Sequence, residues 1–189
     1  VIGADASTNP ITQGNSTASG FVTSSGTVTP LQGITARANA GGVKVGYDNG
    51  TNPSSAASLA GSSSVAVVFV GKSEGENDDQ ANIDLAASDN ALISSVAAAN
   101  PHTIVVLNTG SAVTMPWLNS VAGVFEAWYP GQEDGNAIAG LLFGDVNPSG
   151  HLPVTFPMAL SQVPAQTTAQ WPGTTGLPGC TQPTCVQYS

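Results

Sequence analysis

An acidic loop is the first part of this sequence whose side chains could do chemistry. It spans 71–82, follows the continuous apolar run 65–70, and carries Glu74 and Glu76. Such an apolar run is typical of a strand that is buried on both faces of a parallel sheet. Ligands of these sheets bind outside the carboxyl ends of the strands. The loop is therefore a candidate site, and the alternative interpretation is a solvated acidic surface.

Two further loops are expected at the same edge of the sheet, at 108–115 and 128–132. Ser111 lies in the first of them, but no G-x-S-x-G motif surrounds it, which argues against a serine hydrolase. No glycine-rich stretch has the phosphate-binding pattern between a strand and a helix. The carboxylates are thus the main candidates for chemistry.

The histidines and cysteines do not supply a metal site. His102 and His151 are distant from each other in the sequence and from Cys180 and Cys185, whereas zinc sites need more ligands than these. We expect no metal and no cofactor. The four-residue gap between the cysteines, in a tail rich in Pro and Gly, permits a small disulfide loop. A disulfide suits a secreted protein, and free thiols are the alternative.

The composition narrows the classes of partner. Charged residues make up 8% of the 189 residues and the net charge is −9, against about 25% charged residues in typical domains. Nucleic acids and anionic membranes attract basic surfaces, so neither is an expected partner. No apolar run is long enough to span a membrane. Ser, Thr, Asn and Gly supply the polarity, which favours a secreted, extracellular protein with glycosylation sequons at Asn15 and Asn49.

Periodicity and breaker residues predict the elements that must position these side chains. Asp84 is expected to cap the helix that follows it, and Glu133 is expected in the first turn of its helix, where a carboxylate suits the dipole. The expected elements are strands at 1–6, 43–47, 65–70, 103–107 and 121–127, a short edge strand at 152–156, and helices at 30–40, 54–61, 85–100 and 133–143.

Strands that alternate with helices predict an α/β fold, a three-layer sandwich with a mostly parallel sheet and helices on both faces. The edge strand is placed at 152–156 because it is short and contains Pro153. We expect one domain over 1–170 and an extended tail over 171–189. The first strand begins as if a segment preceded it.

The stretch WYPGQEDGNAIAGLLFGDVNPSGHLPVTFP at 128–157 resembles the C-terminal signature of glycoside hydrolase family 3, the β-glucosidase and β-xylosidase family. The resemblance extends over about 1–172, through VIGADA at 1–6, SEG at 73–75, NPHTIVVLNTG at 100–110 and MPWL at 115–118. It implies the second, α/β sandwich domain of such an enzyme, without its N-terminal barrel.

The resemblance implies that Glu74 is the general acid/base, with Glu76 as the runner-up. A retaining glycosidase needs a second carboxylate as nucleophile, about 5–5.5 Å away. In the family that residue belongs to the barrel, so the chain alone is expected to be inactive, with the barrel and a carbohydrate as its partners. Trp117 and Trp128 fall within family motifs and are interpreted as core, whereas Trp171 is expected to be exposed.

Another interpretation is non-catalytic. The chain would then be a structural, filament-forming or carbohydrate-binding extracellular module derived from that domain. Asp79-Gln80, which stands where the family has Asp-Arg, and the low charge support it. The tail and the first strand could complement the sheet edges of other copies, which would give self-assembly. An open cleft at Glu74 favours the enzyme, and a packed contact favours the module.

Overall fold

The structure is a computed structural model. It describes residues 1–7, 26–72, 74, 80–165, 167, 174–175 and 186–187. Glu76, Asn15, Cys180, Cys185 and Trp171 lie outside these residues, so the predictions made for them stay predictions. None of the helices in the described part is long and apolar enough to cross a membrane.

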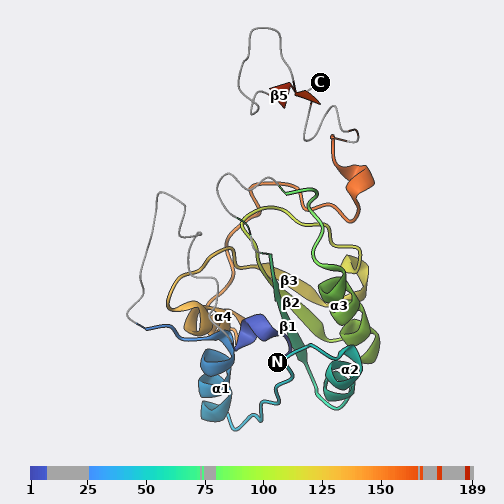
Figure 1. The fold of residues 1–189 in the computed structure, drawn as a ribbon. Helices are drawn as coiled ribbons and strands as arrows, with labels where there is room; N and C mark the ends of the chain where they lie inside the picture. Colours follow the sequence, from blue (N-terminus) through green and yellow to red (C-terminus); the bar gives the residue numbers. More distant parts are fainter. Residues whose placement is uncertain are drawn as a thin grey trace.

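A parallel sheet forms the centre of the domain (Figure 1). Its strands are β1 (Ala66–Gly71), β2 (Thr103–Asn108) and β3 (Gly123–Glu126), in the order β1-β2-β3. Ala66 lies opposite Thr103, and Ile104 lies opposite Gly123. All three strands coincide closely with predicted ones. For β1 and β2 the reason is that continuous apolar runs carry their own signal for burial on both faces.

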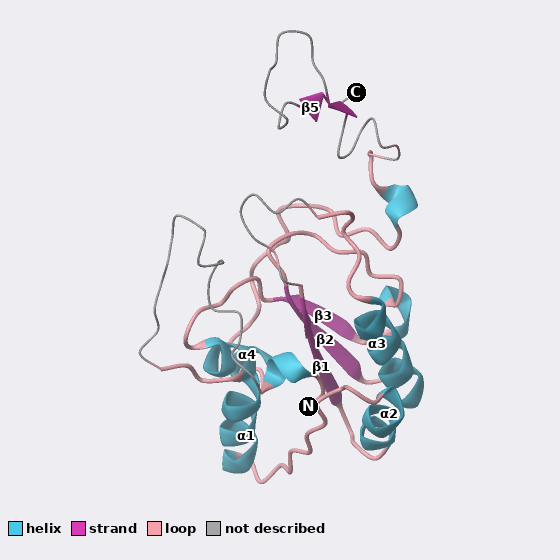
Figure 2. Ribbon diagram, in the orientation of Figure 1, coloured by secondary structure: helices cyan, strands magenta, loops and turns pink. Residues whose placement is uncertain are grey.

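Helices cover both faces of this sheet, as Figure 2 shows. One face carries α1 (Pro30–Ala40) and α4 (Asp134–Leu142), and the other carries α2 (Pro53–Gly61) and α3 (Ala87–Ala99). Alternate strand residues face opposite layers: Phe69 packs with the α1 and α4 side, and Val68 packs with the α2 and α3 side. The predicted three-layer α/β sandwich is confirmed.

Short elements complete the chain. Thr29 begins α1 with a capping box, in which its hydroxyl accepts from the Gln32 N–H and the Gln32 side chain accepts from the Thr29 N–H. The 3-10 turns are η1 (Ala4–Ala6), η2 (Leu118–Ser120) and η3 (Leu160–Gln162). Near the carboxyl terminus, β4 (Thr174–Thr175) pairs antiparallel with β5 (Val186–Gln187).

The amino terminus lies along β1. The Ile2 N–H donates to the Val67 carbonyl at 2.8 Å and the Ile2 carbonyl accepts from the Phe69 N–H at 2.8 Å. On its other side, the Gly3 N–H donates to the Asp48 carbonyl at 2.9 Å. The predicted strand at 1–6 is therefore a bridge between two neighbours that turns into η1 after Gly3.

Two predicted strands are wrong. Residues 43–47 belong to no strand, and within 43–48 only Asp48 forms a bridge, to Ile2. Residues 152–156 form no strand either. Pro153 lacks an N–H to donate to a ladder, and Leu152 and Val154 are both half exposed, so neither anchors the segment in the core.

Asp84 does not cap α3, which is a further correction. The residue before α3 is Ala86, which makes no side-chain capping bond. The Asp84 carboxylate instead accepts from the Thr114 hydroxyl at 2.5 Å. Glu133 directly precedes α4, and its carboxylate accepts from the Asn136 amide at 2.6 Å.

Helices α1 and α4 meet backbone to backbone at two glycines. A Cβ atom at Gly33 would lie 2.1 Å from the Gly135 carbonyl oxygen, so no larger residue fits there. The segment before α1 is also hydrogen-bonded to the turn before α4. The Val28 N–H donates to the Gln132 carbonyl at 2.8 Å, and the Gly135 N–H donates to the Val28 carbonyl at 2.9 Å.

Candidate active site

Three loops meet at the carboxyl end of the sheet. The parallel register places Gly71 opposite Asn108 and Leu107 opposite Glu126, so the segments that follow the three strands share one edge. Glu74 follows β1, Gly110 follows β2, and Tyr129 follows β3. The edge predicted from the sequence therefore gathers side chains from all three loops.

Three groups surround the Glu74 carboxylate. The Gly110 N–H donates to Oε2 at 2.5 Å, the Ser111 hydroxyl donates to Oε1, and the Tyr129 hydroxyl lies 3.5 Å from Oε2. The site has no spare room, because a Cβ atom at Gly110 would lie 2.6 Å from the Tyr129 hydroxyl and 3.0 Å from the Glu74 carboxylate. These contacts fix the orientation of a carboxylate that remains partly exposed.

Glu126, the last residue of β3, is a second carboxyl group in this region that sequence reasoning missed. Its Oε1 accepts from the Trp128 N–H at 2.8 Å, and its Oε2 lies 3.2 Å from the Thr109 hydroxyl oxygen. Burial raises the pKa of Glu126 to about 7, against the lowering effect of hydrogen bonds from Trp128 and Thr109 and with a further small rise from the charge of Glu74. The sequence signal that could have identified Glu126 is its position as a single acidic residue at the carboxyl end of a predicted apolar strand.

The turn after β3 has an unusual backbone. Trp128 has a φ of 54°, in the left-handed region that few non-glycine residues adopt. Its carbonyl accepts from the buried Asn108 amide at 3.4 Å, which helps to hold the turn. The turn directs the Tyr129 hydroxyl toward Glu74. Burial, followed by the charge of Glu74, raises the pKa of Tyr129.

The tryptophans within the family-like motifs pack inside the domain. Trp117 is buried and its indole N–H donates to the Asn90 side chain at 2.9 Å. The Trp128 ring is partly buried and lies 6.0 Å from the Phe156 ring, centroid to centroid.

The remaining predicted residues lie outside this cluster. His102 and His151 are exposed. Within the described ranges, His, Cys, Asp and Glu side chains form no group of three that could hold a metal ion. Asn49 is exposed, and its side-chain oxygen accepts from the Thr51 N–H at 3.0 Å and from the Thr51 hydroxyl at 2.8 Å.

Asp134 is a third unusual carboxyl group. It lies in the first turn of α4 and is fully buried, and neither carboxylate oxygen has a hydrogen-bond partner in the part of the chain that the structure describes. Burial raises its pKa to about 6. In contrast to Glu126, nothing described compensates its ionised form by a hydrogen bond.

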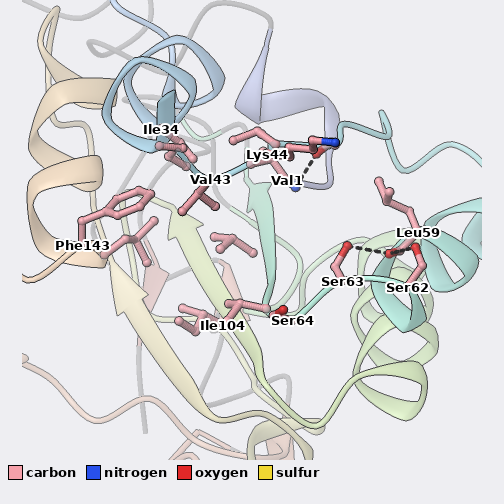
Figure 3. A pocket seen from close by; sticks show the side chains of 16 residues that line it. Val1, Ile34, Val43, Lys44, Leu59, Ser62, Ser63, Ser64, Ile104 and Phe143 are labelled. Atoms are coloured by element: carbon pink, nitrogen blue, oxygen red, sulfur yellow. Dashed lines mark hydrogen bonds between the residues drawn. The ribbon is translucent and has the colours of Figure 1, made fainter. Parts of the chain in front are cut away.

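A cavity of about 620 Å³ lies at the opposite, amino end of the sheet. Figure 3 shows its apolar wall of Ile34, Val43, Ile104 and Phe143 and the three consecutive serines that begin at Ser62. Lys44 is the one charged side chain in its lining, which includes no carboxylate. This cavity therefore has space but no carboxylate in its lining, unlike the cluster at Glu74.

Comparison with known proteins gives one family. Residues 1–184 match the family described as "Glycosyl hydrolase family 3 C-terminal domain". The similar curated proteins include Beta-glucosidase B of Emericella nidulans, which is 50% identical over 117 residues that cover 59% of this chain and 14% of that protein. A beta-glucosidase of Rhizobium radiobacter is 48% identical over 103 residues, which cover 52% of this chain and 12% of that protein.

Solved structures agree. The GH3 beta-glucosidase of Bifidobacterium adolescentis superposes with a TM-score of 0.76 at 32% identity, over 92% of this chain and 26% of that one. A family 3 beta-glucosidase of Neurospora crassa superposes with a TM-score of 0.71 at 29% identity, over 83% of this chain and 22% of that one. The chain thus spans about a quarter or less of the proteins that it matches.

Proposed function

Since the chain belongs to glycosyl hydrolase family 3, whose C-terminal domain it matches over 1–184, we propose that it is part of a β-glucosidase in which Glu74 is the general acid/base. A barrel domain elsewhere in the same polypeptide completes the site. The curated relatives are several times longer than this chain and are named as beta-glucosidases, which supports a larger enzyme of that specificity.

The observation that carries this proposal is the geometry around Glu74. Its carboxylate lies at the carboxyl end of the sheet, oriented by the Gly110 N–H and the Ser111 hydroxyl and approached by the Tyr129 hydroxyl. An acid/base must stay accessible to the glycosidic oxygen while its direction is fixed. Partial exposure together with two donors meets both needs.

In the proposed reaction, protonated Glu74 gives its proton to the leaving-group oxygen while a carboxylate nucleophile forms a glycosyl-enzyme intermediate. The Glu74 carboxylate then takes a proton from the water that hydrolyses the intermediate. Glu126 is not assigned as the nucleophile, because a nucleophilic carboxylate must be ionised and burial raises the pKa of Glu126 to about 7. The nucleophile is therefore assigned to the barrel domain.

We also propose that the protein is secreted. Only 8% of its residues are charged, and the Asn49 sequon lies in an exposed turn. Protein recovered from the culture medium should lose mass when N-glycans are removed enzymatically, and the Asn49→Gln variant should lose less. Protein that stays inside the cells without glycans contradicts the proposal.

The acid/base assignment is tested in the full-length polypeptide that carries this domain. Glu74→Ala should lower hydrolysis of an alkyl β-glucoside about 10²–10⁴-fold. A nitrophenyl β-glucoside should be affected less in its first step, because its leaving group departs without a proton. Added azide should then restore turnover by replacing the water that Glu74 activates, with a β-glycosyl azide as product.

Glu133→Gln is the matched control, since Glu133 is an exposed glutamate whose carboxylate contacts Asn136. It should leave both substrates unaffected. Equal losses for both leaving groups, or a Glu74→Ala enzyme with full activity, would contradict the role of Glu74.

A further inference from the structure

One hydroxyl group connects the two carboxyl groups of the site. The Thr109 hydroxyl oxygen is buried and lies 2.6 Å from the Ser111 carbonyl oxygen and 3.2 Å from Glu126 Oε2. A hydroxyl carries a single hydrogen, and a carbonyl oxygen can only accept. The shorter distance assigns the Thr109 hydrogen to the Ser111 carbonyl. The contact with Glu126 is then a hydrogen bond only if Glu126 supplies the proton.

Burial outweighs the other donors around Glu126. Oε1 accepts from the Trp128 N–H, and the Thr109 backbone N–H is a further donor to the carboxyl group; both lower its pKa, but burial is the larger effect. The contact with the Thr109 hydroxyl assigns the proton to Oε2. Among the described residues, the titratable groups near it are Glu74, whose charge opposes its ionisation, and Tyr129, which is neutral in the physiological range. The one ion pair in the described residues, between Arg37 and Asp145, does not involve it. Burial raises its pKa to about 7, so the proton is present in mildly acidic solution.

We propose that Glu126 is a neutral carboxylic acid that donates its proton to the Thr109 hydroxyl and so positions the 109–111 loop against the Glu74 carboxylate. Glu126 acts through Thr109, and not on the substrate, so it is a positioning residue. Its importance for catalysis rests on the proposed function of Glu74, whereas its protonation can be measured without any hydrolysis.

Loss of this proton changes the loop in a defined way. The proton leaves Oε2 for the solvent, and the Thr109 hydrogen then turns to the carboxylate, because a charged acceptor makes the stronger hydrogen bond. The Ser111 carbonyl loses its donor. Gly110 and Ser111, which both hold Glu74, move with it. The loop is therefore ordered below a pH of about 7 and loosened above it.

The test follows amide resonances of the full-length polypeptide that carries this domain, labelled with ¹⁵N in tryptophan and glycine, from pH 4 to pH 9. The Trp128 amide should shift in one step with a midpoint of about 7, because its acceptor changes charge there. The Gly110 amide should shift in the same step, because Thr109 couples the two carboxyl groups. In Glu126→Gln both steps should vanish, with the signals held near their positions at low pH, since the amide keeps one acceptor and one donor.

Matched variants separate this proposal from a purely structural role. Thr109→Val should keep the Trp128 step but uncouple Gly110, whereas Thr109→Ser should keep both. Glu74→Gln should move the Trp128 step to lower pH, because a neighbouring negative charge is removed. Glu133→Gln should change nothing.

The wild-type curve alone can overturn the proposal. A Trp128 step at about 4.3, the ordinary value for a glutamate, would show that Glu126 is ionised in neutral solution. A step that persists in Glu126→Gln would assign it to another group. Either result leaves the leaving-group test of Glu74 untouched, so the two proposals fail separately.

Discussion

The two ends of the central sheet differ in what they offer a ligand. Around Glu74 the carboxyl end leaves little free space, because a Cβ atom at Gly110 would lie 2.6 Å from the Tyr129 hydroxyl and 3.0 Å from the Glu74 carboxylate. The amino end has a cavity of about 620 Å³ with apolar walls and one cationic side chain, Lys44. Cavity size alone would select the amino end, although binding sites also need convergent polar groups. In this domain the polar groups converge where space is scarce, because another domain is proposed to complete the site.

The largest contrast should come from adding one methyl group at each end. Gly110→Ala places a Cβ atom against Tyr129 and Glu74 and must displace one of them. In the full-length polypeptide it should lower β-glucoside hydrolysis by about 10²-fold. Gly46→Ala, in the amino-end cavity, meets only the flexible end of Leu59, at 2.9 Å. It should keep the wild-type rate, and similar losses for the two variants would remove the distinction between the ends.

Asp134→Asn tests whether a buried carboxyl group without hydrogen-bond partners, in contrast to Glu126, lowers the folding stability when it ionises. Because burial raises the folded-state pKa from 3.8 to about 6, folding stability is highest at low pH and falls as the pH rises through this window. The variant lacks this loss. At pH 7.5 its free energy of unfolding should exceed that of the wild type by about 1–3 kcal/mol.

Urea unfolding at pH 4 and pH 7.5 measures this difference. The gain should be small at pH 4, where wild-type Asp134 is largely protonated in the folded state. A variant that is equally or less stable at both values would indicate that Asp134 has a stabilising partner.

Two neighbouring valines of β1 differ in the space around them. Val67 lines the amino-end cavity, whereas Val68 is fully buried against the other helical layer. Val67→Ile should therefore stabilise the domain by about 0.8 kcal/mol, the value of one buried methylene. Val68→Ile should destabilise it by about 1–3 kcal/mol through overpacking. Thermal unfolding of both variants checks the signs, and equal signs would mean that the cavity does not accept the added carbon.

The smallest effect is expected beside the amino-end cavity, at the ion pair between Arg37 and Asp145. Arg37 Nε lies 2.6 Å from Asp145 Oδ2, and the Arg37 guanidinium also stacks over Phe143, which lines the cavity. The hydrogen bond from Arg37 lowers the pKa of Asp145, so the stabilisation exists above the unfolded value of 3.8 and is lost as the pH falls through the lower, folded value. Both groups are exposed. Asp145→Asn should cause only a slight fall in Tm at pH 7, which about 1 M salt should abolish.

Sequence reasoning reached the inner strands because their signal is local. The apolar runs at 65–70 and 103–107 require burial on both faces wherever they lie. The segments 43–47 and 152–156 carry no such requirement, because a strand also needs a partner that pairs along its length. Residues 46–48 meet residues 1–3 in only a few backbone hydrogen bonds, which form a bridge and no strand. Pattern alone does not reveal how far such pairing extends.

The two carboxyl groups of the candidate site also differ in how far they could be predicted from the sequence. Glu74 lies in a motif that resembles a family signature, and so it could be found from the sequence. Glu126 depends on Thr109 after another strand and on the reversed backbone of Trp128, and neither relation is written in its own neighbourhood. A motif can identify the role of a single residue. Its protonation depends on contacts that form only when the loops at the carboxyl end of the sheet come together.

The glycine contact between α1 and α4 has a mechanical consequence. Gly33 and Gly135 leave no side chain between the helices that could yield. Val28 is hydrogen-bonded both to Gln132 and to Gly135, within a few residues of Tyr129. A displacement of helix α1 should therefore be transmitted to the turn that carries Tyr129. Tyr129 is one of the three groups around the Glu74 carboxylate, so the displacement should also change the position of that carboxylate.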